Sequence, residues 1–202
     1  MTLTPEQGRV LGCLIEKQLT TPQQYPMTDS ALLAACNQST SRDPVVDYDV
    51  ATVRLAVRAL RESGLLRTVH RTGERSDKHQ HQLDAALGLA TDQIALLAVL
   101  LLRGPQTVAE LRARSERLHP FQSAEKVEQV LAALGDRDEP LVDRLERQPG
   151  RKESRFTQLL GETAPAYAVP QGLAVVGLSE QLDQLRTEVA ELRREVQELR
   201  AR

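Results

Sequence analysis

The sequence contains two copies of one predicted structural unit, which consists of three short amphipathic helices followed by a two-stranded hairpin. Each helix of the first copy follows a polar residue that can cap its N-terminus: Thr4, Thr28 or Asp29, and Asp47. The third helix is expected to turn one apolar face to the core, formed by Val50, Val53, Val57 and Leu60. Two short strands around a polar turn at 72–77 follow.

The second copy repeats this order. Thr107 with Glu110 and then Ser123 supply caps, and strands are expected in 141–147 and 153–160. The repeat predicts a mainly α fold with small β-hairpins: tandem winged helix-turn-helix domains. A three-helix bundle without wings is the alternative, and the matching polar hairpins favour the winged form. The expected domains are 1–83 and 84–161, then a linker at 162–177 and a coiled-coil helix at 178–202.

Four stretches carry a family resemblance: LGCLIEKQLTTPQQYP (11–26), AACNQSTSRDPV (34–45), LLLRGPQTVAELRAR (100–114) and PGRKESRFTQL (149–159). With these motifs, the chain resembles the YceH-like family of uncharacterised bacterial proteins over residues 3–160. The resemblance implies a tandem winged-helix fold and no assigned activity, because a fold does not fix a function.

Composition narrows the possible functions. The formal net charge is −2, so any surface for nucleic acid has to be local. Only five aromatic residues occur, too few for the stacking platforms that single-stranded nucleic acid needs. No phosphate loop, nucleophile elbow or paired-carboxylate motif is present, which predicts a non-enzyme without a cofactor. The longest apolar run, 94–102, is too short to span a membrane, and without a secretory signal the chain is expected in the cytoplasm.

Three arginines form the first candidate contact with double-stranded DNA. Arg54, Arg58 and Arg61 lie along one stripe of the third helix, which enters the major groove in helix-turn-helix proteins. Arginine there can bond guanine edges or phosphates. The alternative is a solvated face, favoured by the acidic residues before the helix, Asp43, Asp47 and Asp49.

The two hairpins form the second candidate. Their basic residues could contact phosphates, or could protect exposed strand edges from pairing with other chains. In the first hairpin these residues are Arg67, Arg71, Arg75 and Lys78, and in the second Arg144, Arg147, Arg151, Lys152 and Arg155. The third helix of the second copy is more acidic, with Glu125 and Glu128 on exposed positions, so that copy suits protein docking better.

Metal binding and disulfide formation have weak support. His79 and His81 share one side of a strand, but no CxxC or HxxxH spacing occurs, so no metal is expected. Ser123 and Lys126 match SxxK by chance, since Ser123 serves as a cap. Cys13 and Cys36 lie within apolar helical patterns and are expected as core residues.

The last segment predicts a homodimer. Its apolar residues alternate spacings of four and three: Leu178, Leu182, Leu185, Val189, Leu192, Val196 and Leu199. With valine at a and leucine at d, such a seam favours two parallel strands. Glu188 would then face Arg193 of the second copy, and Glu195 would face Arg200. The alternative is a helix folded back on its own domains. A dimeric DNA-binding regulator is the leading hypothesis, and a protein-interaction scaffold is the alternative.

Overall fold

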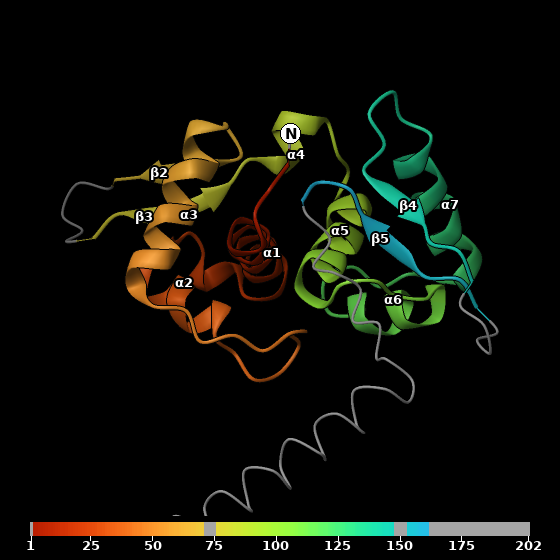
Figure 1. The fold of residues 1–202 in the computed structure, drawn as a ribbon, viewed down its shortest axis with the longest axis horizontal. Helices are drawn as coiled ribbons and strands as arrows, with labels where there is room; N and C mark the ends of the chain where they lie inside the picture. The colour runs from red at the N-terminus through yellow and green to blue at the C-terminus, as the bar shows by residue number, and fades with distance from the viewer. Residues whose placement is uncertain (1, 71–75, 148–152, 162–202) are drawn as a thin grey trace, which may run out of the picture. The chain divides into compact units, whose positions relative to one another are not determined.

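The computed structural model describes residues 2–70, 76–147 and 153–161 (Figure 1). This part of the chain is mainly helical, with small antiparallel sheets, as the sequence predicts. The first repeat contains α1 (Pro5–Thr20), the 3-10 helix η1 (Pro22–Gln24), β1 (Met27–Thr28), α2 (Asp29–Cys36), α3 (Val50–Glu62), β2 (Leu66–Val69) and β3 (Lys78–His81). The second contains α4 (Leu83–Leu87), α5 (Thr91–Arg103), α6 (Val108–Ser115), α7 (Ala124–Gly135), β4 (Val142–Arg144) and β5 (Phe156–Gln158).

The two repeats share their strand order. In the first repeat β3 lies between β1 and β2, antiparallel to both, with Met27 opposite His79 and Thr68 on the other side of the same residue. In the second repeat β5 pairs with β4, and an isolated bridge between Gln106 and Phe156 takes the place of β1. Helix order and strand order therefore match from one repeat to the other.

Local capping signals account for most helix starts. Thr4, Thr28, Thr107 and Ser123 each accept a hydrogen bond from a backbone N–H in the first turn, as predicted. The prediction for α3 was wrong by two residues, because Asp49 rather than Asp47 accepts the bond, from the N–H of Thr52 at 2.7 Å. Starting the helix later leaves Val50 at its first position and 43% exposed, so this valine is not a core residue.

The packing of α1 on α5 joins the repeats into one compact unit that spans Met1–Ala166. In Figure 1, α1 is seen nearly end-on, with α2 and α3 on one side of it and α5 on the other. Close approach depends on Gly12, because a Cβ atom there would lie 2.9 Å from Leu102 Cγ. Leu3, which precedes α1, also forms an isolated β-bridge with Gly161, so the start of the first repeat pairs with the end of the second.

The connection between α2 and α3, residues 37–49, is a long loop held by side chains. Asn37 Nδ2 donates to the Tyr48 carbonyl at 2.8 Å, and Tyr48 N donates to Asn37 Oδ1 at 2.9 Å, which closes its two ends. Inside the loop, the buried Arg42 donates to both carboxylate oxygens of Glu16 on α1. The buried Arg9 donates to the carbonyls of Cys36 and Pro44. These bonds fix the loop against α1.

Two further predictions concern membrane crossing and cysteines. No helix in the described ranges combines the length and apolar character that crossing a membrane requires. Cys13 and Cys36 are buried and free, which confirms the prediction that they are core residues. The linker at 162–177 and the predicted coiled-coil helix at 178–202, with its seam from Leu178 to Leu199, lie outside the described residues.

Candidate nucleic-acid interface

The three arginines of α3 lie together on its exposed side. Spacings of four and three keep Arg54, Arg58 and Arg61 on one stripe, while Val53, Val57 and Leu60 face the core. The Arg54 side chain is 66% exposed. The structure therefore presents this stripe to solvent, as the sequence predicts.

Arg54 is oriented by a carboxylate from a neighbouring helix. Its Nε donates to Asp29 Oδ2 at 2.8 Å, and Asp29 is the first residue of α2. The other carboxylate oxygen, Oδ1, lies 2.7 Å from His79 Nε2 on β3. Burial disfavours the Asp29 carboxylate, but the bonds from Arg54 and His79 outweigh this and hold its pKa below the ordinary value. Asp29 thus links α2, α3 and the hairpin on one face.

This arrangement leaves the terminal nitrogens of Arg54 available. Within the described residues, the only hydrogen bond of the Arg54 side chain is the one from Nε. A guanidinium that bonds only through Nε still has N–H donors on its two terminal nitrogens, and such donors can bond guanine or phosphate. Local sequence patterns do not indicate this role for Asp29, because its partners are 25 and 50 residues away.

Apolar side chains lie exposed beside the arginine stripe. Leu55 is 66% exposed on α3, Val50 is 43% exposed at its start, and Val45 in the preceding loop is 57% exposed. These are the large apolar residues most exposed in the first repeat. Apolar groups beside arginine suit contact with thymine methyl groups as well as with an apolar partner.

The acidic residues before α3 do not form one cluster at its start. Asp43 N donates to the Leu102 carbonyl at the end of α5, which places this aspartate with the second repeat. Asp49 is the cap, and bonds from the backbone and side chain of Thr52 lower its pKa. Asp47 is exposed. The capping carboxylate is therefore directed at the helix backbone.

The predicted basic residues of the hairpins have different environments. Arg67 is exposed on β2, while Lys78 is half-buried on β3. Arg144 lies over the Phe156 ring, 5.9 Å from its centroid, and Arg147 is exposed. Arg155 Nη1 lies 2.8 Å from Glu110 Oε2, so its charge is engaged within the second repeat. The remaining four, Arg71, Arg75, Arg151 and Lys152, lie outside the described residues.

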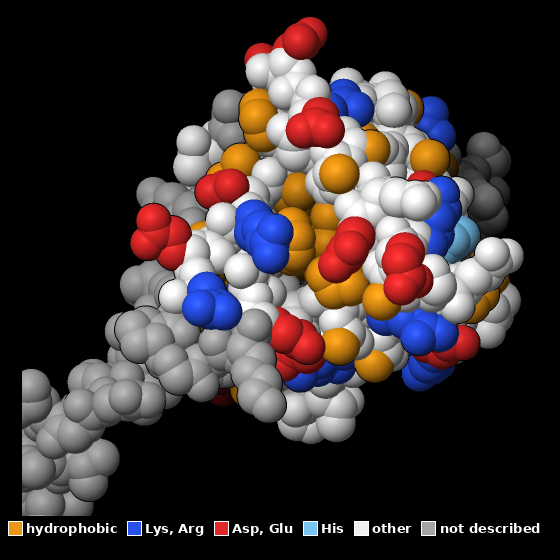
Figure 2. All heavy atoms as spheres, turned by 90° about the vertical axis from the view of Figure 1, so that its right-hand side faces the viewer, with side chains coloured by type: hydrophobic (Ala, Val, Ile, Leu, Met, Phe, Trp, Pro, Cys, Tyr) orange, Lys and Arg blue, Asp and Glu red, His pale blue; other side chains and the backbone are white. Residues whose placement is uncertain are grey.

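The second repeat has a groove on its surface. It has a volume of about 790 Å³ and lies between α6, α7 and the β4–β5 hairpin. Its apolar lining comes from Val108, Ala109, Ala124, Ala132 and Phe156. Figure 2 shows this side of the molecule, with apolar side chains in a hollow and both acidic and basic side chains around it. Glu125 and Glu128 are exposed on α7, as expected.

The two strand histidines are buried and hydrogen-bonded. His79 bonds to Asp29 and lies 3.3 Å from Thr68 Oγ1, and His81 Nε2 bonds to Gln18 Oε1. Burial lowers the pKa of His81, partly offset by the charge of Asp84. Among the described residues, no three histidine, cysteine or acidic side chains converge as a metal site would require. That the protein holds no stoichiometric zinc stays a prediction.

Comparison with known proteins identifies the family. Residues 3–151 match the family described as "Protein of unknown function, DUF480". A UPF0502 protein of Koribacter versatilis is 45% identical over 195 residues, covering 95% of this chain and 91% of that protein. Another, from Geobacter sulfurreducens, is 48% identical over 197 residues, covering 94% and 90%. A third, from Shewanella sp. strain ANA-3, is 40% identical over 207 residues, covering 99% and 95%.

The chain therefore belongs to the DUF480, or UPF0502, family of uncharacterised bacterial proteins. This confirms the resemblance to an uncharacterised YceH-like family. The relatives' names state no activity, so function has to be argued from the geometry of this chain.

Proposed function

We propose that both repeats are winged helix-turn-helix units and that the first one binds double-stranded DNA. Supporting the fold are the element order, three helices then a hairpin, and the shared strand order with the third strand in the middle. The loop at 37–49 is longer than the usual turn between the two helices of this motif. Its closure by Asn37 and Tyr48 keeps α2 and α3 in contact.

The observation that carries the proposal is the arginine stripe of α3 with Arg54 oriented by Asp29. In this fold α3 is the helix that enters the major groove. Arg54 then reads a base edge or a phosphate, and Arg58 and Arg61 follow along the same stripe. Leu55 beside them contacts a thymine methyl group. The hairpin basic residues, Arg67 among them, contact flanking phosphates.

This mode of binding is weak and electrostatic. Few phosphates are neutralised by such a surface, and the chain as a whole carries a net charge of −2. A homodimer through residues 178–202 compensates, because two first repeats then engage one duplex together. The proposed role is that of a dimeric transcriptional regulator.

Fluorescence anisotropy at low salt, with a labelled pool of random duplexes, tests the interface. The triple variant Arg54→Ala, Arg58→Ala, Arg61→Ala is expected to lose most of its affinity for the duplex. A matched triple on and just after α6, Arg112→Ala, Arg114→Ala, Arg117→Ala, removes the same charge from the second repeat and is expected to retain most of it. Equal loss in both triples would show that binding does not use α3.

A scaffold function is the second candidate, and the groove of the second repeat favours it. An apolar hollow ringed by charges of both signs is typical of a surface that binds a protein segment. If the chain is a scaffold, it binds no duplex even at low salt, and a partner purified with it is lost from the variant Ala132→Arg, which fills the groove. A partner that tolerates Ala132→Arg would count against this candidate.

A further inference from the structure

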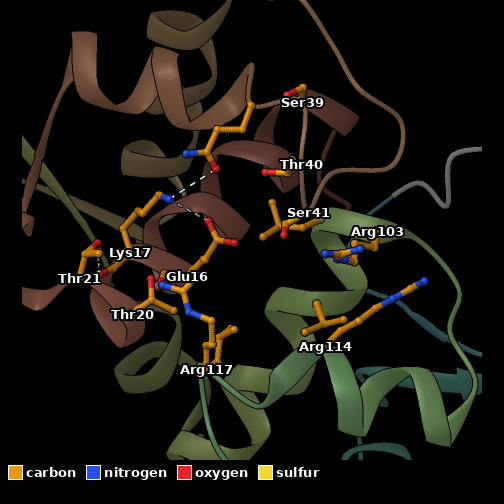
Figure 3. Close-up of a pocket in the computed structure, with 14 residues that line it drawn as sticks. Glu16, Lys17, Thr20, Thr21, Ser39, Thr40, Ser41, Arg103, Arg114 and Arg117 are labelled. Carbon is orange, nitrogen blue, oxygen red and sulfur yellow. Dashed lines mark hydrogen bonds and ion pairs between the residues drawn. The ribbon is translucent and has the colours of Figure 1, made fainter.

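A second cavity lies where the two repeats meet. Its volume is about 420 Å³, and its walls come from the end of α1, the start of the 37–49 loop, the end of α5 and α6 with the turn that follows it (Figure 3). The first repeat contributes mainly polar side chains, and the second contributes arginines: Arg103, Arg114 and Arg117.

The positive charge of this cavity exceeds its negative charge. Four basic side chains line it, Lys17 and the three arginines, against one carboxylate, Glu16. That carboxylate is already neutralised, since Arg42 bonds both of its oxygens, at 3.1 and 2.7 Å, and Lys17 lies 3.3 Å away. Glu16 therefore does not balance the arginines across the cavity.

Two of the three arginines have no ionic partner. Arg114 points away from α1 in Figure 3 and lies 3.7 Å from Glu110, whose other oxygen is 2.8 Å from Arg155. Within the described residues, Arg103 and Arg117 form no ion pair. Arg103 points toward Ser41, and Arg117 extends toward the end of α1.

Electrostatic repulsion acts on Arg103. Burial comes first among the causes that lower its pKa, and the charges of Arg114 and Arg42 come next, while Glu16 and Asp43 oppose them only in part. Bringing like charges together in a partly buried place costs free energy in the absence of a counter-charge. An anion in the cavity would remove this cost.

The loop opposite the arginines supplies hydroxyl groups. Ser39, Thr40 and Ser41 line the cavity, and their hydroxyls bond to no other group in the described ranges. Ser41 has a φ of 60°, a left-handed backbone conformation that is costly for a residue with a side chain. Its carbonyl accepts a bond from Arg42 Nη1 at 2.9 Å, so the buried arginine holds this conformation.

We propose that this cavity binds a small phosphate-bearing molecule, with the phosphate between Arg103 and Arg117. Guanidinium groups bind phosphate oxygens through charge-assisted hydrogen bonds, and the hydroxyls of the loop donate to those that remain. Lys17 adds a third positive charge. Because the ligand contacts both repeats, it fixes the end of α1 against α6. This site goes beyond DNA binding and is independent of it.

Pyrophosphate is the probe for the test. The full chain is titrated by calorimetry and by thermal unfolding, at an ionic strength held constant with sodium chloride. We expect saturable binding and a Tm raised by several degrees, because a ligand that binds only the folded state stabilises it. The double variant Arg103→Gln, Arg117→Gln is expected to lose at least tenfold in affinity. Its own Tm is expected to equal or exceed that of the wild type, since repulsion at Arg103 is relieved.

The control is Lys126→Ala, which removes an exposed basic side chain of α7 outside the cavity and is expected to bind pyrophosphate as the wild type does. The single variant Arg117→Ala provides a second measurement and is expected to lose affinity with little change in folding, because this side chain is exposed. Equal Tm increases in the wild type and the Arg117→Ala variant would overturn the proposal. Tighter binding of citrate than of pyrophosphate would overturn the assignment to phosphate.

Discussion

Arg42 is the residue on which the loop between α2 and α3 depends. Its side chain is fully buried, and it donates hydrogen bonds to the side chains of Glu16 and Gln38. It also donates to the backbone carbonyls of Ala35 and Ser41. A buried ion pair contributes less than its Coulomb energy suggests, but removing one partner leaves the other charge buried and unpaired. Removing the Arg42 side chain therefore destabilises the folded state, because the Glu16 carboxylate loses its main partner.

The variant Arg42→Ala is expected to lower the free energy of unfolding by about 3 kcal/mol, because Glu16 is left without its main partner. Lys17→Ala is the matched control. Lys17 contacts the same carboxylate at 3.3 Å from a more exposed position, so it should cost less than about 1 kcal/mol. Urea unfolding of both variants provides the comparison. Similar losses in the two would contradict the role given to Arg42.

The same pair predicts a dependence of stability on pH. Burial acts to raise the pKa of Glu16, but the hydrogen bond and charge of Arg42, with help from Lys17, hold it below the ordinary value of 4.5. A carboxylate whose pKa is lower in the folded state stabilises the protein above its unfolded pKa, and this contribution is lost as pH falls through the folded pKa. Wild-type stability should therefore fall below about pH 4.5.

The stability of the Glu16→Gln variant should decrease less than that of the wild type as pH falls, because the glutamine side chain cannot be protonated. Urea unfolding between pH 3 and pH 6 measures the difference, with Glu139→Gln as an exposed control. The wild type and Glu16→Gln should converge in stability toward low pH. Parallel curves across this range would exclude Glu16 as the source.

Among the elements, α1 and α5 form the contact on which the joining of the repeats depends. Two glycines of α1 face α5, but they differ in the space around them. A Cβ at Gly12 would come within 2.9 Å of Leu102, whereas one at Gly8 would meet Leu101 at an ordinary 3.4 Å. The two positions therefore separate the cost of crowding from the effect of glycine itself.

Gly12→Ala is expected to destabilise the protein by about 1–3 kcal/mol, because a methyl group there pushes into Leu102. Gly8→Ala is expected to be neutral or to stabilise by up to about 1 kcal/mol, since alanine favours helix over glycine and the space allows it. Thermal unfolding of both variants gives the two signs. A destabilising Gly8→Ala of equal size would mean that α1 and α5 do not pack in this way.

Most helix boundaries follow from local sequence signals, whereas contacts between distant residues do not. Caps such as Thr107 and Ser123 were predictable because their partners lie within one turn. Sequence alone does not locate the cap of α3, because Asp47 and Asp49 are equally suitable, and the predicted core position of Val50 is wrong for the same reason. Interactions over long separations gave no local signal: Asp29 with Arg54 and His79, and Arg42 with Glu16. Charged residues are rarely buried, so pattern alone places them on the surface.

For the whole molecule, assembly through the C-terminal segment stays a prediction from the sequence. Truncation after Gly177 is expected to give a monomer by light scattering, because the apolar seam from Leu178 to Leu199 is removed. In the full chain, Leu185→Cys should form a crosslink between two copies if the strands are parallel. A dimer that survives truncation would place the interface on the repeats. A tail-dependent dimer without the crosslink would indicate antiparallel strands.

The dependence of duplex affinity on salt tests the central claim most directly. The logarithm of the binding constant falls with the logarithm of salt concentration in proportion to the phosphates contacted. For the full chain this slope should be negative, in proportion to the few phosphates contacted, and Arg54→Ala, Arg58→Ala, Arg61→Ala should reduce its magnitude by about one to three, as lost phosphate contacts require. An unchanged slope and affinity in this triple variant, or no duplex binding by the wild type at low salt, would contradict DNA recognition by α3.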